Sequence, residues 1–127
     1  MNRVCRALII EDEAMVAMLI EDLLADLGCE VGHSAANARE AERAAQDCDV
    51  DFALLDVNLG DGQTSFGAAQ VLKARQVPYA WVTGYGAQVI PAEHGDAPVL
   101  HKPVNPGLLA SVVRRFSDER GCCTDEV

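Results

Sequence analysis

The sequence predicts an α/β fold in which helices cover both faces of a parallel, five-stranded sheet. Short apolar runs alternate along the chain with longer segments whose apolar residues recur at helical spacing. Polar residues follow several of these runs, which is typical of parallel sheets with a site outside the carboxyl ends of the strands. The 127 residues, half of them apolar, suit one domain with a substantial core.

The first half of the chain is expected to contain three strands and two helices. In residues 14–27 the apolar residues recur at helical spacing with acids between them, which predicts a helix that Gly28 ends. Asn37 is the expected N-cap of the second helix. The mostly apolar run 51–55 favours a central strand. The expected elements are strand 6–10, helix 14–27, strand 30–34, helix 37–47 and strand 51–55.

The second half is expected to continue this alternation and to end in a helix. Asn105 is the expected N-cap of that helix, with Pro106 at its first position. The segment 88–93 is a weaker helix prediction, because it contains Pro91 and lies between glycines. The expected elements are loop 60–64, helix 65–74, strand 78–82, turn 84–86, short helix 88–93, strand 97–100 and helix 105–116.

Polar groups follow four of the expected strands, namely Glu11-Asp12-Glu13 after strand 6–10, Asp56 after strand 51–55, Thr83 after strand 78–82 and His101-Lys102-Pro103 after strand 97–100. If these strands lie side by side, the groups converge on one pocket. Clustered carboxylates need a cation among them, and a hard ion such as Mg²⁺ takes oxygen ligands. Mg²⁺ beside an aspartate nucleophile suits phosphoryl transfer, with Lys102 and Thr83 contacting phosphoryl oxygens.

Each of these residues also has an ordinary structural interpretation. Asp56 taken alone would be a solvated strand end. The acids at 11–13 complement the dipole of the helix that follows them, and we interpret Glu13 as purely structural. A lysine taken alone is most often a surface residue. The combination of the acids with Thr83 and Lys102 favours Asp56 as a phosphoacceptor.

The set IIEDE, LLDVN, VTGYG and HKP resembles the receiver domain of two-component response regulators, over essentially the whole chain. The resemblance implies the flavodoxin-like (βα)5 three-layer sandwich with sheet order 2-1-3-4-5. It also implies that a sensor histidine kinase phosphorylates Asp56 in the presence of Mg²⁺. The Mg²⁺ ligands that the resemblance implies are Glu11, Asp12, Asp56 and the backbone carbonyl of Asn58. It implies Thr83 and Lys102 as phosphoryl-binding or switch residues. It also implies a cis peptide bond between Lys102 and Pro103.

The chain departs from the usual receiver pattern at several positions. Receivers commonly carry two aspartates where this chain has Glu11-Asp12. They often carry an aromatic residue where Val99 and Leu100 stand, and a proline where Gly60 stands, so we expect a freer loop after the phosphoacceptor. The run PYAWVTGYG resembles the subgroup called FAT GUY receivers. We expect Tyr85, between two glycines, to be the aromatic residue that moves on activation.

The resemblance implies a stand-alone receiver over residues 4–117, followed by a flexible tail at 118–127. We expect a sensor histidine kinase or a histidine phosphotransferase as phosphate donor. The output is either a contact with a downstream protein through segments 88–93, 97–100 and 105–116, or service as a phosphate sink. We expect no enzymatic activity beyond phosphorylation and dephosphorylation of the chain itself.

Two alternatives remain open. One is a degenerate receiver that takes no phosphate and serves as a constitutive docking domain. The other is a small aspartate-nucleophile phosphatase of the haloacid dehalogenase kind, which would need a second acid where Asn58 stands.

The formal net charge of −10 argues against nucleic acid or an anionic membrane surface as a partner. Five cysteines, an odd number with no CxxC pair, predict reduced thiols in a cytoplasmic protein. We find no signal peptide and no run long enough to span a membrane. The apolar residues of the last helix can serve the core or a homodimer; they are Leu108, Leu109, Val112 and Val113.

Overall fold

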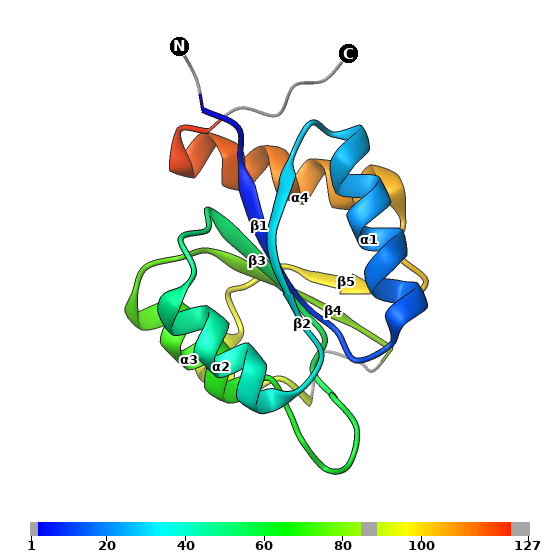
Figure 1. Ribbon diagram of the computed structural model, residues 1–127, viewed down its shortest axis with the longest axis vertical. Helices are drawn as coiled ribbons and strands as arrows, with labels where there is room; N and C mark the ends of the chain where they lie inside the picture. The colour runs from blue at the N-terminus through cyan, green and yellow to red at the C-terminus, as the bar shows by residue number, and fades with distance from the viewer. Residues whose placement is uncertain (1–2, 85–88, 123–127) are drawn as a thin grey trace.

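A computed structural model describes residues 3–84 and 89–122 of the chain. In this part of the chain, five strands form one parallel sheet in the order β2-β1-β3-β4-β5 (Figure 1). The strands are β1 (Arg6–Ile10), β2 (Glu30–Ala35), β3 (Phe52–Leu55), β4 (Tyr79–Thr83) and β5 (Val99–His101). The helices are α1 (Ala14–Asp26), α2 (Ala38–Asp47), α3 (Phe66–Ala74) and α4 (Pro106–Arg120), with a 3₁₀ helix, η2, at Ala92–His94. The predicted α/β fold and strand order are confirmed.

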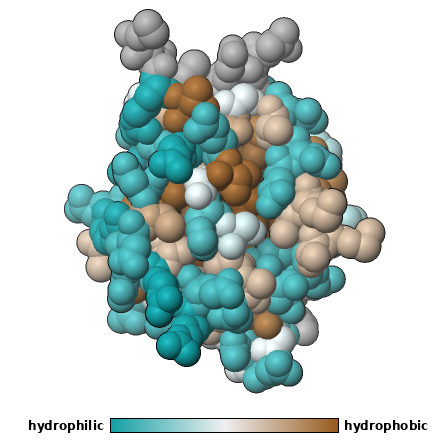
Figure 2. All heavy atoms as spheres, viewed as in Figure 1, coloured by the Kyte–Doolittle hydropathy of each residue, from teal (hydrophilic) through white to brown (hydrophobic). Residues whose placement is uncertain are grey.

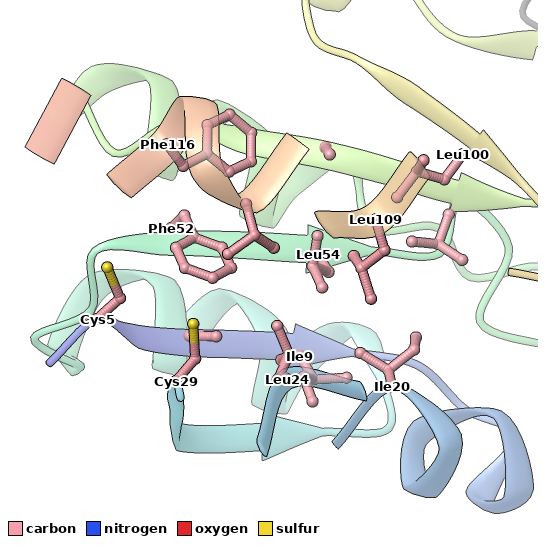
Figure 3. Packing of buried hydrophobic residues seen from close by; sticks show 14 of the residues in the cluster. Cys5, Ile9, Ile20, Leu24, Cys29, Phe52, Leu54, Leu100, Leu109 and Phe116 are labelled. Atoms are coloured by element: carbon pink, nitrogen blue, oxygen red, sulfur yellow. The ribbon is translucent and has the colours of Figure 1, made fainter. Parts of the chain in front are cut away.

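Helices cover both faces of the sheet. Figure 1 shows α1 and α4 on one face and α2 and α3 on the other. The side chains of each strand alternate between the two faces, so successive residues of β3 belong to two separate apolar clusters. Phe52 and Leu54 face α1 and α4 and pack with Leu109 and Phe116, as Figure 3 shows. The four residues of β3 are all buried, which agrees with its central place.

Two asparagines start helices at the predicted positions. Asn37 accepts a hydrogen bond from the amide of Glu40 at 2.9 Å, and Asn105 accepts one from the amide of Leu108 at 3.0 Å. These side chains satisfy amides that have no partner inside their helices. Asn105 therefore fixes where α4 begins, just beyond the end of β5.

The last helix extends further than expected. It reaches Arg120, where residue Gly121 adopts a left-handed φ of 66° that suits a glycine cap. The expected helix end at residue 116 was therefore wrong. Apolar side chains of Leu109 and Val113 are fully buried on α4, whereas Leu108 is 58% exposed. The core thus takes most of the apolar face that was considered for a homodimer.

A disulfide joins Cys5 to Cys122, and this corrects the expectation that all five cysteines are reduced. Both residues are buried, and they are 117 positions apart in the sequence. Their proximity results from tertiary structure, because the start of β1 and the end of α4 lie at the same end of the molecule (Figure 1). No local spacing could reveal such a pair. Cys29 is buried with a free thiol, as expected, and Cys48 is partly buried and also free.

Polar side chains predominate on the molecular face drawn in Figure 2, with hydrophobic residues showing in its middle. Among the helices that the structure describes, none has the length and hydrophobicity required to cross a membrane.

Candidate functional site

The register of the sheet aligns the carboxyl ends of β1 and β3. Ile10 pairs with Leu55, so the residues that follow, Glu11 and Asp56, leave the sheet side by side. The amide of Asp56 donates to the carbonyl of Ile10 at 2.8 Å. On the other side of β3, the amide of Lys102 donates to the carbonyl of Thr83 at 2.9 Å. Backbone hydrogen bonds therefore bring the predicted strand-end residues to one edge of the sheet.

Lys102 lies among three carboxylates. Its ammonium Nζ is 2.9 Å from Oδ2 of Asp56, 3.0 Å from Oε1 of Glu11 and 3.2 Å from Oε1 of Glu13. Asp56 is 5% exposed and Glu11 is 2% exposed, so two of these ion pairs have little access to water. Glu13, which we interpreted as purely structural, thus also contacts the lysine of the site.

The acidic groups form one cluster beside a pocket. Carboxylate oxygens from all four acids lie within 4.8 Å of one another, namely Glu11, Asp12, Glu13 and Asp56. A pocket of about 350 Å³ opens onto the cluster, lined by Asp12, Glu13, Asp56, Asn58, Gly60, Gly84 and Lys102. The pocket is large enough to admit a phosphoryl group and water molecules.

The cluster carries more negative than positive charge, and this shifts the pKa values of its buried groups. Burial raises the pKa of Glu11 to about 7; the hydrogen bond from Lys102 acts against this rise, and the charge of Asp56 adds to it. Burial alone would lower the pKa of Lys102, but its hydrogen bonds and charge interactions with Asp56 and Glu11 outweigh burial and raise it. Lys102 is therefore positively charged at physiological pH, and its single charge cannot balance a cluster of four acids.

This donor set fits Mg²⁺. Oxygen donors from carboxylates are the ligands that this ion prefers, and it retains several waters, for which the pocket has room. Oε1 of Glu11 is buried and accepts no hydrogen bond, although it lies 3.0 Å from Nζ of Lys102. A buried carboxylate oxygen without a hydrogen bond is costly, and a divalent cation would stabilise it. Asp12, Asp56 and Asn58 face the pocket and can hold the ion, and Glu11 belongs to the same cluster of carboxylates.

The loop after Asp56 is ordered by its own hydrogen bonds. Residues Asn58 and Thr64 form an antiparallel bridge, and the amide of Leu59 donates to the carbonyl of Gln63 at 2.9 Å. The side chain of Asn58 accepts a hydrogen bond from the amide of Gly60 at 3.0 Å. Gly60 adopts a left-handed φ of 83°, which a proline cannot adopt. The loop is therefore a short hairpin, in contrast to the freer loop that we expected.

The remaining predicted residues have different outcomes. Thr83 is fully buried at the end of β4, directly before Gly84, which lines the pocket. The Lys102-Pro103 peptide bond is cis. Tyr85 lies outside the described residues, so its expected movement stays a prediction. Sequence reasoning missed Ser65, whose hydroxyl donates to the backbone carbonyl of Asp56, because nothing in a serine's sequence context signals such a contact.

Known proteins resemble this chain in sequence and in fold. The response regulator receiver domain family matches residues 7–114. The regulator PhyR of Methylorubrum extorquens is 32% identical over 109 residues, which are 84% of this chain but only 41% of PhyR. The chemotaxis protein CheY of Thermotoga maritima is 24% identical over 116 residues, covering 88% of this chain and 97% of CheY.

Two solved structures share the fold over almost their whole length. SdrG from Sphingomonas melonis Fr1 is 32% identical with a TM-score of 0.79, covering 91% of this chain and 98% of SdrG. The receiver domain of PhyR from Erythrobacter litoralis is 25% identical with a TM-score of 0.80, covering 96% of each chain. The family match and the shared fold agree, and the chain belongs to the response regulator receiver domain family.

Proposed function

We propose that the chain accepts a phosphoryl group on Asp56 from a phosphohistidine of a sensor histidine kinase or a histidine phosphotransferase. The observation that carries this proposal is the position of Asp56, whose carboxylate ends a central strand, faces the pocket and lies 2.9 Å from Lys102. Charge neutralisation and positioning are the main requirements of phosphoryl transfer, and the site offers both.

In the proposed reaction, a carboxylate oxygen of Asp56 forms a bond to phosphorus. The bond between phosphorus and the donor imidazole breaks, and its electron pair returns to the ring nitrogen. Lys102 holds the carboxylate in place before transfer and offers its charge to the phosphoryl oxygens during transfer. Mg²⁺ would supply the positive charge that the lysine alone cannot, and the groups that would hold it are Glu11, Asp12, Asp56 and the backbone carbonyl of Asn58.

A donor protein must cover the mouth of the pocket to deliver its phosphoryl group. The helices α1 and α4 begin close after the pocket residues Glu13 and Lys102. Their outer faces carry apolar side chains that are unusually exposed, since Met15 is 84%, Met18 61% and Leu108 58% exposed. We propose that the donor covers these side chains, because exposed apolar groups beside a polar site mark protein contacts.

The proposed output is a protein contact controlled by phosphorylation. PhyR, which this chain matches over part of its length, is described as an anti-anti-sigma factor in Bartonella quintana, so a receiver of this kind can govern a protein partner. We place the contact on η2, β5 and α4, which adjoin Thr83 and Lys102. Transfer onto Asp56 would shift a two-state equilibrium of this surface.

The phosphatase alternative lacks its general acid. At the required position the side chain is that of Asn58, and its oxygen is occupied by the amide of Gly60. The constitutive docking alternative predicts no phosphorylation and is decided by the experiment that follows.

The test is intact-mass spectrometry after incubation with acetyl phosphate, with and without Mg²⁺, on the wild type and Asp56→Asn. We expect an adduct of one phosphoryl group on the wild type that requires Mg²⁺, and none on the variant. Asp51→Asn is the matched control, because Asp51 is a buried aspartate that pairs with Arg3 away from the pocket. A folded wild type that takes no phosphoryl group would support the docking alternative.

A further inference from the structure

We infer that Ser65 is a positioning residue, whose hydroxyl fixes the backbone of Asp56 and so holds the acceptor carboxylate for transfer. This inference rests on the proposed phosphoacceptor role of Asp56. Ser65 is fully buried although its side chain is polar. Its Oγ donates to the carbonyl oxygen of Asp56 at 2.5 Å. The hydroxyl thus contacts the acceptor's own peptide group across nine positions of sequence.

Ser65 stands at the start of α3, but its side chain does not cap the helix. Ser65 is the N-cap of α3, and a serine there normally accepts a hydrogen bond from an amide of the first helical turn. The Ser65 side chain makes no such bond, whereas Asn37 and Asn105 cap α2 and α4 in the usual way. The hydrogen bond to Asp56 is thus the one that the Ser65 side chain makes near the start of α3, and the first turn of that helix receives none from it.

Both the amide and the carbonyl of Asp56 are therefore hydrogen-bonded. Its amide donates to Ile10 of β1 at 2.8 Å, and its carbonyl accepts from Ser65. The amide of Ser65 in turn donates to the carbonyl of Val57 at 3.1 Å. Ser65 therefore closes the base of the hairpin that leaves the sheet directly after Asp56.

The same hairpin carries other parts of the site. Asn58, whose backbone carbonyl is an expected Mg²⁺ ligand, and Gly60 both line the pocket. If the bond from Ser65 is lost, the peptide after Asp56 can rotate, and the carboxylate and Asn58 move together relative to Lys102. Reaction rates depend steeply on the position of the reacting groups. A misplacement of about 1 Å can slow a reaction about 100-fold, so a smaller shift is enough to slow it about tenfold.

The test compares Ser65→Ala with Ser117→Ala. Ser117 is the matched control, since it is also buried and its Oγ donates to a backbone carbonyl, that of Cys122, at 2.6 Å. Each variant loses one buried hydroxyl–carbonyl hydrogen bond, but Ser117 lies near the end of α4, far along the helix from the pocket. Ser65→Thr keeps the hydroxyl and is the rescue variant.

Two readouts separate positioning from general destabilisation. The first is the initial rate of Mg²⁺-dependent phosphorylation by acetyl phosphate, measured well below the Tm of every variant. The second needs no Mg²⁺ and is the amide hydrogen exchange of Leu59 and Gln63, which are bonded inside the hairpin. We expect Ser65→Ala to react about tenfold more slowly and to exchange these amides faster. Ser117→Ala should change neither readout, and Ser65→Thr should restore both.

The inference is overturned if Ser65→Ala loses stability as Ser117→Ala does but keeps the wild-type rate and the wild-type exchange of the hairpin amides. A wild type that takes no phosphoryl group would overturn the proposed function instead. In that case hydrogen exchange alone decides whether Ser65 holds the peptide of Asp56: faster exchange in Ser65→Ala supports it, and unchanged exchange overturns it.

Discussion

Lys102 is the residue on which the charges of the site depend. It provides the only cationic side chain lining the pocket, among the residues that the structure describes, and it contacts three carboxylates. Without it, Glu11 and Asp56 would face each other in a poorly hydrated place with no positive charge between them. The lysine therefore stabilises the folded chain before it takes part in any reaction.

We predict that Lys102→Met lowers the free energy of unfolding by about 2 kcal/mol in the absence of Mg²⁺, because the buried carboxylates of Glu11 and Asp56 lose their counter-ion. Added Mg²⁺ should recover more stability in this variant than in the wild type. Urea unfolding with and without Mg²⁺ measures both effects. Lys73→Met is the control, because Lys73 donates to the carbonyl of Glu93 outside the pocket. Equal stability of Lys102→Met and the wild type without Mg²⁺ would contradict the prediction.

Among the residues of the site, the sequence predicted those that directly follow strands. Glu11, Asp56 and Lys102 were predictable because parallel strands present their carboxyl ends at one edge of the sheet. Glu13 and Ser65 were not, because their contacts depend on how a helix start and a hairpin fold back over that edge. Such contacts join side chains to distant groups and leave no periodic signal in the chain.

In the described residues of the connection between β4 and β5, a 3₁₀ helix stands where the alternation predicts an α-helix. This 3₁₀ helix is the three-residue η2, in which His94 is buried. The imidazole of His94 forms a hydrogen bond with the hydroxyl of Tyr79, and its ring packs edge-on against Tyr79 and Trp81. In the described part of this connection, the buried His94 attaches the segment to the sheet.

We predict that His94 makes stability depend on pH. Burial lowers its pKa below the ordinary value of 6.5; Glu93 opposes this shift and Lys73 adds to it. Above pH 6.5 the folded and unfolded chains both hold the neutral ring, so the full stability is present. As pH falls below 6.5, the unfolded chain binds the proton first, and the free energy of unfolding decreases.

Urea unfolding between about pH 7.5 and about pH 5.5 checks this prediction. His94→Gln, which keeps an acceptor for Tyr79, should lose the part of the pH dependence that belongs to the imidazole. His33→Gln is the control, because His33 is exposed on β2. An identical pH dependence in His94→Gln and the wild type would show that the imidazole is not responsible.

For the whole molecule, the parallel sheet covered by helices on both faces followed from the pattern of apolar runs, whereas the sheet order followed from the family resemblance alone. The pairing of Cys5 with Cys122 followed from neither, because it depends on two chain ends that meet only after all five strands have formed. Counting cysteines predicted free thiols, whereas the fold places two of them in contact. The disulfide closes almost the entire chain into one covalent loop.

We predict that reduction of this disulfide, or the substitution Cys5→Ser, lowers the free energy of unfolding by about 3 kcal/mol, because the unfolded chain regains the freedom that the long loop had removed. Urea unfolding with and without a reductant measures the change. Cys48→Ser is the control and should respond to reductant as the wild type does, since Cys48 is a free thiol. A reductant that leaves the wild type as stable as before would contradict the prediction.

Because of the Cys5–Cys122 bond, a cut in the backbone between these residues does not separate the chain into two molecules. A single proteolytic nick anywhere between these residues opens a ring, and the two fragments stay attached through sulfur. The exposed tip of the hairpin, around Asp61 and Gly62, is the natural place for such a cut, since it lies outside both apolar clusters. A cut there leaves every strand and helix whole and the two fragments joined by the disulfide, which makes the hairpin tip the place to test circular permutation of this receiver.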